Sequence, residues 1–77
     1  MVTVEEARLI AEKFNRDNVP LKKGVVWDEG DYYVYGYEEI VEMGGSICVN
    51  KTTGVPGIYM LNATTIPRMK KARIITE

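Results

Sequence analysis

Few side chains of this 77-residue chain are of a type that carries out covalent or proton-transfer chemistry. The single cysteine, Cys48, has no histidine to activate it, because the sequence contains none, and its neighbours are apolar. Glu38 and Glu39 form a pair of carboxylates, but adjacent residues of a strand point to opposite faces, which does not suit a general acid and base. We therefore expect no catalytic residues and a chain that is not an enzyme.

No motif indicates a metal or a cofactor. One cysteine without histidine cannot build a zinc site of the usual kind, and the acidic residues lack the spacing of a calcium loop. Gly44-Gly45-Ser46 is too short for a phosphate loop. We expect neither metal-ligating nor cofactor-binding residues.

Charge is unevenly distributed along the chain. Residues 1–23 carry a net charge of +1, residues 24–50 carry −6 without a single basic residue, and residues 51–77 carry +4. The acidic third is also rich in aromatic residues, with Trp27 and four tyrosines within eleven residues.

An aromatic face with an acidic rim has a composition suited to binding a basic protein surface. The residues predicted to bind such a partner are Trp27, Asp31, Tyr33, Tyr35, Tyr37, Glu38 and Glu39. The alternative is that one tyrosine face packs under a helix and the other is ordinary half-exposed sheet, although each buried tyrosine hydroxyl then needs a partner.

The sequence offers two alternatives to a basic protein partner, namely nucleic acid and a second copy of the chain. Four C-terminal cations could contact phosphates, namely Arg68, Lys70, Lys71 and Arg73. Carboxylates beside the strand aromatics would repel phosphate, so we expect a protein partner, such as a toxin or an enzyme with a basic surface, rather than nucleic acid. A homodimer is the other alternative, because sheet edges and an uncovered sheet face favour self-association.

The sequence predicts a cytoplasmic protein without membrane contact. No stretch approaches the roughly 18 apolar residues of a membrane span, the N-terminus lacks the pattern of a signal peptide, and a lone thiol fits a reducing compartment. No linker divides the chain, so we expect a single domain over residues 1–77.

A helix and two hairpins must position these residues. Thr3 and Glu6 fit a capping box, and an apolar stripe at helical spacing follows to Phe14, before residues 15–18 end the helix. The first hairpin pairs residues 25–27 with 32–37 around a turn at 28–31, with Tyr33, Tyr35 and Tyr37 on one face.

The second hairpin pairs residues 46–50 with 57–61 around a turn in which Gly54 can take a positive φ. Pro56 indicates that its second strand begins at an edge or a bulge. Residues 38–45 between the hairpins read as a loop or an irregular strand end that breaks at Gly44-Gly45.

The C-terminal part is ambiguous. Residues 62–67 predict a loop, and residues 68–75 fit either a short helix or a strand ending in Ile74-Ile75, while residues 68–77 could also be a frayed basic tail. The predicted fold class is α+β, with an N-terminal helix packed on a three- to four-stranded antiparallel sheet in the order α-β-β-β-β. One helix covers about one face, so the second face must be polar, bound to a partner or self-associated.

The chain also resembles a known family. The segments TVEEARLIAEKF, DYYVYGYEE and GGSICVNKTTG are similar to the immunity protein 35 family of bacterial polymorphic toxin systems, over residues 3–60. The resemblance implies a small α+β protein that binds a toxin; the family's characteristic tryptophan would fall on Tyr33, and the basic tail has no counterpart. A helix followed by a strand and a Thr-Gly turn also resembles PepSY-type domains.

Overall fold

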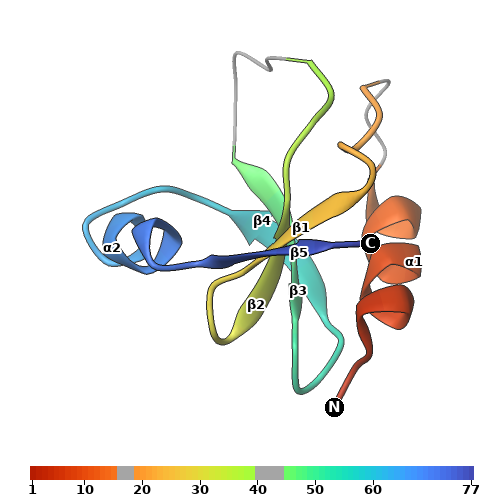
Figure 1. Cartoon of the computed structure of the whole chain (residues 1–77), viewed down its shortest axis with the longest axis horizontal. Helices are drawn as coiled ribbons and strands as arrows, with labels where there is room; N and C mark the ends of the chain where they lie inside the picture. The colour runs from red at the N-terminus through yellow and green to blue at the C-terminus, as the bar shows by residue number, and fades with distance from the viewer. Residues whose placement is uncertain (16–18, 40–44) are drawn as a thin grey trace.

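In a computed structural model, which describes residues 1–15, 19–39 and 45–77, a sheet lies between two helices (Figure 1). The elements are α1 (Val4–Phe14), β1 (Val25–Asp28), β2 (Tyr32–Tyr35), β3 (Ser46–Asn50), β4 (Pro56–Tyr59), α2 (Thr65–Lys70) and β5 (Arg73–Thr76). The strand order is β4-β3-β2-β1-β5, and every neighbouring pair is antiparallel. The predicted α+β class is confirmed, but the sheet has five strands and not three or four.

The capping box at the start of α1 is confirmed. The Thr3 hydroxyl accepts from the Glu6 amide, and the Glu6 carboxylate accepts from the Thr3 amide. Ala7 and Ala11 are fully buried, so their small side chains let α1 lie close to the sheet. The helix ends at Asn15, which is its C-cap, and residues 16–18 of the predicted stop lie outside the described residues.

The first face of the sheet packs under α1. Val26, Tyr33, Tyr35, Ile47 and Val49 form one core cluster with the two alanines of α1 and with Leu21. The alternation of β2 therefore holds as predicted: the odd-numbered tyrosines share this face, and Val34 lies on the other.

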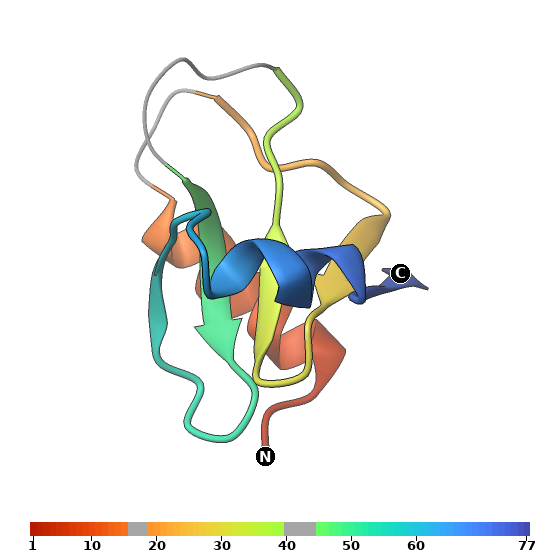
Figure 2. The ribbon, with the colours of Figure 1, turned by 90° about the vertical axis from the view of Figure 1, so that its left-hand side faces the viewer.

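The second face is covered by α2 of the same chain. The sequence predicts instead a face that is polar, bound to a partner or self-associated. Val34, Cys48 and Tyr59 form a smaller cluster there, and Met69 of α2 packs against it. Figure 2 shows α2 in front of the sheet and α1 behind it. The predicted loop at 62–67 was wrong from Thr65 onward, because α2 begins there.

Residues 68–75 adopt both of the patterns that the sequence allowed, one after the other. α2 ends at Lys70, and β5 then pairs with β1, with Ile75 opposite Val26 and Ile74 opposite Trp27. This fifth strand was one of the two alternatives for residues 68–75 but was not counted in the predicted sheet, and residues 68–77 form the end of a helix and a sheet edge instead of a frayed tail. The described part of the chain contains no helix with the length and apolar character needed to cross a membrane.

Two glycines hold the second hairpin in shape. Gly54 has a φ of +77°, as its turn required, and a Cβ there would also meet Val2 of the N-terminal segment. Gly45 lies against the Tyr59 carbonyl so closely that a Cβ would overlap it. The rest of the predicted break, at residues 40–44, lies outside the described residues.

Candidate functional site

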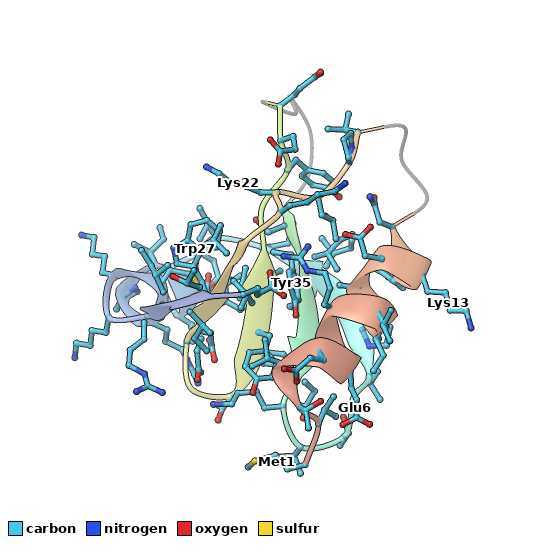
Figure 3. All side chains as sticks on the ribbon, turned by 45° about the vertical axis from the view of Figure 1, so that its right-hand side comes forward. Met1, Glu6, Lys13, Lys22, Trp27 and Tyr35 are labelled. Atoms are coloured by element: carbon cyan, nitrogen blue, oxygen red, sulfur yellow. The ribbon has the colours of Figure 1, made fainter. Side chains whose placement is uncertain are left out.

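The seven residues predicted to bind a partner do not share one surface. Tyr33 and Tyr35 are 7% and 0% exposed beneath α1, and Tyr37 packs against the same core cluster. Trp27 packs against the cluster on the opposite face, as Figure 3 shows by the positions of Trp27 and Tyr35. The expected aromatic face is therefore not available to a partner, because α1 occupies it.

The three predicted acids are exposed, but they lie at opposite ends of β2. Asp31 lies in the β1–β2 turn, whereas Glu38 and Glu39 follow the other end of the strand. Glu38 accepts a hydrogen bond from the Lys23 amide at 3.0 Å. Only Glu38 and Glu39 keep the character of an exposed acidic rim, since Asp31 binds Arg68.

The buried acid of β1 is bound to cations from the C-terminal third. Both Asp28 oxygens accept from Lys51 Nζ, at 2.9 and 2.8 Å, and Arg73 lies 3.6 Å away. Burial alone would raise the pKa of Asp28, but the Lys51 ammonium and the Gly30 amide hold it below its ordinary value.

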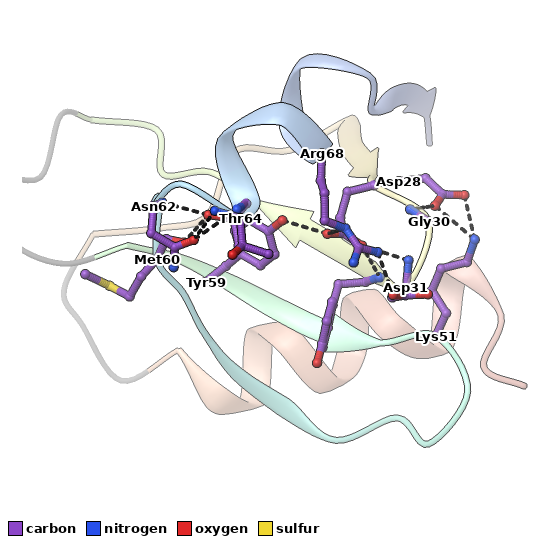
Figure 4. Close-up of polar contacts among 12 residues, drawn as sticks. Asp28, Gly30, Asp31, Lys51, Tyr59, Met60, Asn62, Thr64 and Arg68 are labelled. Carbon is purple, nitrogen blue, oxygen red and sulfur yellow. Dashed lines mark hydrogen bonds and ion pairs between the residues drawn. The ribbon is translucent and has the colours of Figure 1, made fainter.

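Glu29 is the centre of a second cluster, which ties α2 to the β1–β2 turn. Figure 4 shows three other members of this cluster, Asp31, Tyr59 and Arg68. Arg68 Nε lies 2.9 Å from Glu29 Oε2, and Arg68 Nη2 lies 2.5 Å from Asp31 Oδ2. The Tyr59 hydroxyl also donates to Glu29, at 2.6 Å. Burial opposes the charge of Glu29, yet the bonds from Tyr59 and from two backbone amides, with the Arg68 charge, lower its pKa. Burial and this bond together raise the pKa of Tyr59 to about 12.

Half of the acids in the −6 segment are paired within the protein. Three acids of the −6 segment bind three cations of the +4 segment, namely Lys51, Arg68 and Arg73. The acids are consequently not free to attract a basic partner, and two of the four cations that suggested phosphate binding already face carboxylates.

Cys48 does not have the surroundings of a nucleophile. Its side chain is buried on the second face, and burial, with the nearby Glu29 charge, raises the pKa of the thiol. Across the three described ranges, no group of three or more Cys, Asp or Glu side chains is placed to hold a metal ion.

The hydroxyl of Tyr35 is buried without a hydrogen-bond partner among the described residues. Burial raises the pKa of this hydroxyl. The Arg8 guanidinium lies 4.6 Å from the centre of the ring. The arrangement is an Arg–aromatic contact that anchors α1, since Arg8 also binds Glu77 and the Val25 carbonyl.

The surface with the features of a binding site is the outer edge of β4. β4 ends the strand order, so no strand of the described residues pairs with its outer side. The large apolar side chains that are exposed in this strand and directly beside it in the sequence are Val55, Ile58, Met60 and Leu61. No charged residue occurs anywhere between Lys51 and Arg68. Exposed edges normally carry charge that prevents pairing with other chains, and this one does not.

A groove adjoins this edge on the second face. Its volume is about 440 Å³, and its lining includes Tyr32, Cys48, Gly57, Tyr59 and Met60. Gly57 faces Cys48 across the β3–β4 pair, and its missing side chain leaves the floor of the groove open.

The sequence contains a signal for this edge that lies in its composition and not in any motif. Sixteen consecutive residues, 52–67, have no charge in a chain in which 27% of the residues are charged. Pro56 also indicated an edge strand, correctly. Neither signal shows by itself that these residues form one surface. That follows only from the strand order, which places β4 at the end of the sheet.

Comparison with known proteins adds no relative: no family model, curated protein or solved structure matches this chain.

Proposed function

We propose that this chain is a non-enzymatic protein-interaction domain that binds an extended, uncharged segment of a partner protein along the outer edge of β4. The observation that supports the proposal is a combination of two features: an edge strand whose outer side pairs with no strand of residues 1–15, 19–39 or 45–77, and a run of sixteen residues without charge. Such an edge offers backbone donors and acceptors to an incoming strand, and its exposed side chains favour an apolar one.

The chemistry of the edge selects the partner segment. Ile58 and Met60 are 55% and 52% exposed, so a bound strand would remove apolar surface from water on both sides of the pair. A charged side chain on the incoming strand would lose hydration without meeting an opposite charge in residues 52–67. A neutral, β-prone segment therefore fits better than the basic surface expected from the sequence.

The resemblance to toxin-immunity proteins over residues 3–60 supports the same class of role, because an immunity protein acts by covering a partner. Glu38 and Glu39 remain exposed and could still contact a basic partner. The β4 edge is uncharged and the Glu38–Glu39 surface is acidic. One experiment can therefore distinguish them by the charge of the partner that each binds.

A library of random peptides selected on the immobilised chain tests the proposal. We expect the selected peptides to be uncharged and rich in β-branched or aromatic residues, and we expect Ile58→Lys to abolish their binding. Ile74→Lys is the matched control, because Ile74 is also an exposed isoleucine, 64% against 55% for Ile58, and lies on the other edge strand, β5.

Selection of basic peptides that bind Ile58→Lys normally but fail to bind Glu38→Lys with Glu39→Lys would overturn the proposal in favour of the acidic surface. Failure to select any peptide above a background without protein would contradict both surfaces.

A further inference from the structure

The backbone groups of β4 point alternately toward β3 and away from it. The Asn50 amide donates to the Val55 carbonyl at 3.0 Å, and Val49 lies opposite Pro56. Because antiparallel pairs alternate, Gly57 and Tyr59 direct their backbone groups toward β3. Ile58 and Met60 direct theirs outward, together with the carbonyl of Pro56. The N–H that Pro56 lacks therefore falls on the open side, where proline is tolerated.

We propose that the segment bound at this edge is β4 of a second copy of the chain, paired antiparallel about Ile58 so that the two sheets join into one of ten strands. The inference rests on the proposed role of the β4 edge and names its partner.

The outward groups are complementary to themselves in this register. Ile58 would lie opposite Ile58 of the second copy, and the two residues would exchange two N–H···O=C bonds. The Met60 amide of each copy would donate to the Pro56 carbonyl of the other. Four hydrogen bonds form in this way. The Met60 carbonyl, which faces the proline that lacks a donor, already accepts from the Thr65 hydroxyl of its own copy at 2.6 Å.

The side chains fit the same register. Ile58 lies on the α1 face, opposite Ile47 within its own sheet, so the two Ile58 side chains would meet across the symmetry axis. Gly57 would lie opposite Tyr59 of the second copy at the close, non-hydrogen-bonded position, where glycine leaves room for the ring. Since Gly57 and Tyr59 both line the groove, the second copy would add a wall to its open side.

Charge favours self-pairing at β4 over β5. Two copies of residues 52–67 bring no charged group into the interface. β5 begins with Arg73, whose side chain is 81% exposed, and the same pairing there would take that charge out of water.

Molar mass measured by light scattering and sedimentation equilibrium over a wide range of concentration tests the inference. We expect the wild-type chain to reach twice its 8.7 kDa, Ile58→Lys to stay monomeric, and Ile74→Lys to dimerise like the wild type. Under mild oxidation we expect Ile58→Cys to form a covalent dimer, because Cα atoms of such a pair lie about 5.5 Å apart, within the range of disulfides. Ile74→Cys is the control, and the native Cys48 is buried.

A wild-type chain that stays monomeric at the highest concentration, with no cross-link from Ile58→Cys, would overturn the inference. The proposed function would survive that result if uncharged library peptides still bound in an Ile58-dependent manner, and it would fail with the inference if they did not. A dimer dissociated by Ile74→Lys but not by Ile58→Lys would also contradict the pairing at β4.

Discussion

The two edges of the sheet are built in opposite ways. β5 begins with an exposed arginine and follows two lysines, and Glu77 just after it binds Arg8 of α1. β4 has no charge within it or for several residues on either side. Both edges are four-residue strands with an exposed isoleucine, so length and hydrophobicity do not separate them. The two edges differ in charge. We therefore expect charge to keep the β5 edge solvated, and its absence to allow the β4 edge to pair with another strand.

α2 connects the two edges across the second face, and it is held by charge (Figure 2). We expect Arg68→Ala to lower the free energy of unfolding more than any other substitution proposed here, because it leaves the Glu29 carboxylate buried without its cation. The loss should be smaller than for a fully buried pair, since the Arg68 side chain is 38% exposed. Urea unfolding measures it.

Lys70→Ala removes another cation of α2 that is exposed, and it should change stability by less than about 0.5 kcal/mol. Equal effects of the two substitutions would mean that the Glu29 cluster does not hold α2 in place.

Two buried tyrosines provide a sharper comparison. Tyr59 of β4 donates to Glu29, whereas the Tyr35 hydroxyl has no partner within the described residues. We expect Tyr59→Phe to cost about 1.5 kcal/mol, the value of a hydrogen bond to a charged group. Tyr35→Phe should be neutral or slightly stabilising, since it removes an unpaired polar atom. Thermal or urea unfolding of both variants measures the difference, and a larger loss from Tyr35→Phe would contradict this account of the core.

Lowering the pH should destabilise the β1–β5 pair before it destabilises the β3–β4 pair. The pKa values of Asp28 and Glu29 are lowered in the folded chain, so both contribute stability above about pH 4, where unfolded carboxyls ionise. That stability is lost as the pH falls through their folded pKa values. Asp28 loses its ion pair with Arg73 at the start of β5 when it is protonated, whereas the contact of β4 with Glu29 is made through a Tyr59 hydroxyl that can still donate to a neutral carboxyl.

Amide exchange measured at pH values from 6 to 3 checks this expectation. Protection should fall first in the β1–β5 pair and later in the β3–β4 pair. Simultaneous loss in both pairs would show that the ion pairs do not stabilise one edge selectively.

The smallest effect is expected from making the charged edge resemble the open one. Arg73→Thr removes the charge within β5, and Lys71→Thr removes one just before it. With both substitutions, weak self-association should appear at high concentration even in an Ile58→Lys background. Light scattering measures it. A double variant that stays strictly monomeric would mean that charge is not what protects β5.

Local features of this fold could be read from the sequence, and long-range ones could not. The capping box at Thr3, the turn at Gly54 and the alternation of Tyr33 and Tyr35 depend on neighbouring residues, and all three were predicted correctly. The choice between a helix and a strand at residues 68–75 stayed open because Ile74 and Ile75 become a strand only when β1 lies beside them.

The same holds for the candidate site: its local features could be read from the sequence, and its long-range contacts could not. The acidic stretch was visible in the sequence, but its pairing with Arg68 and Lys51 joins residues more than twenty positions apart, which no local pattern reveals. The absence of charge from residues 52–67 was equally visible, and only the strand order turned it into an open edge.

Amide hydrogen exchange at two residues tests the central claim most directly. The amides of Ile58 in β4 and Ile74 in β5 both point away from the sheet by the alternation of their strands. The account predicts that exchange at Ile58 slows when protein concentration is raised or when a selected peptide is added, while Ile74 exchanges fast throughout. Exchange at Ile58 that stays as fast as at Ile74 under every condition would contradict a binding role for the β4 edge.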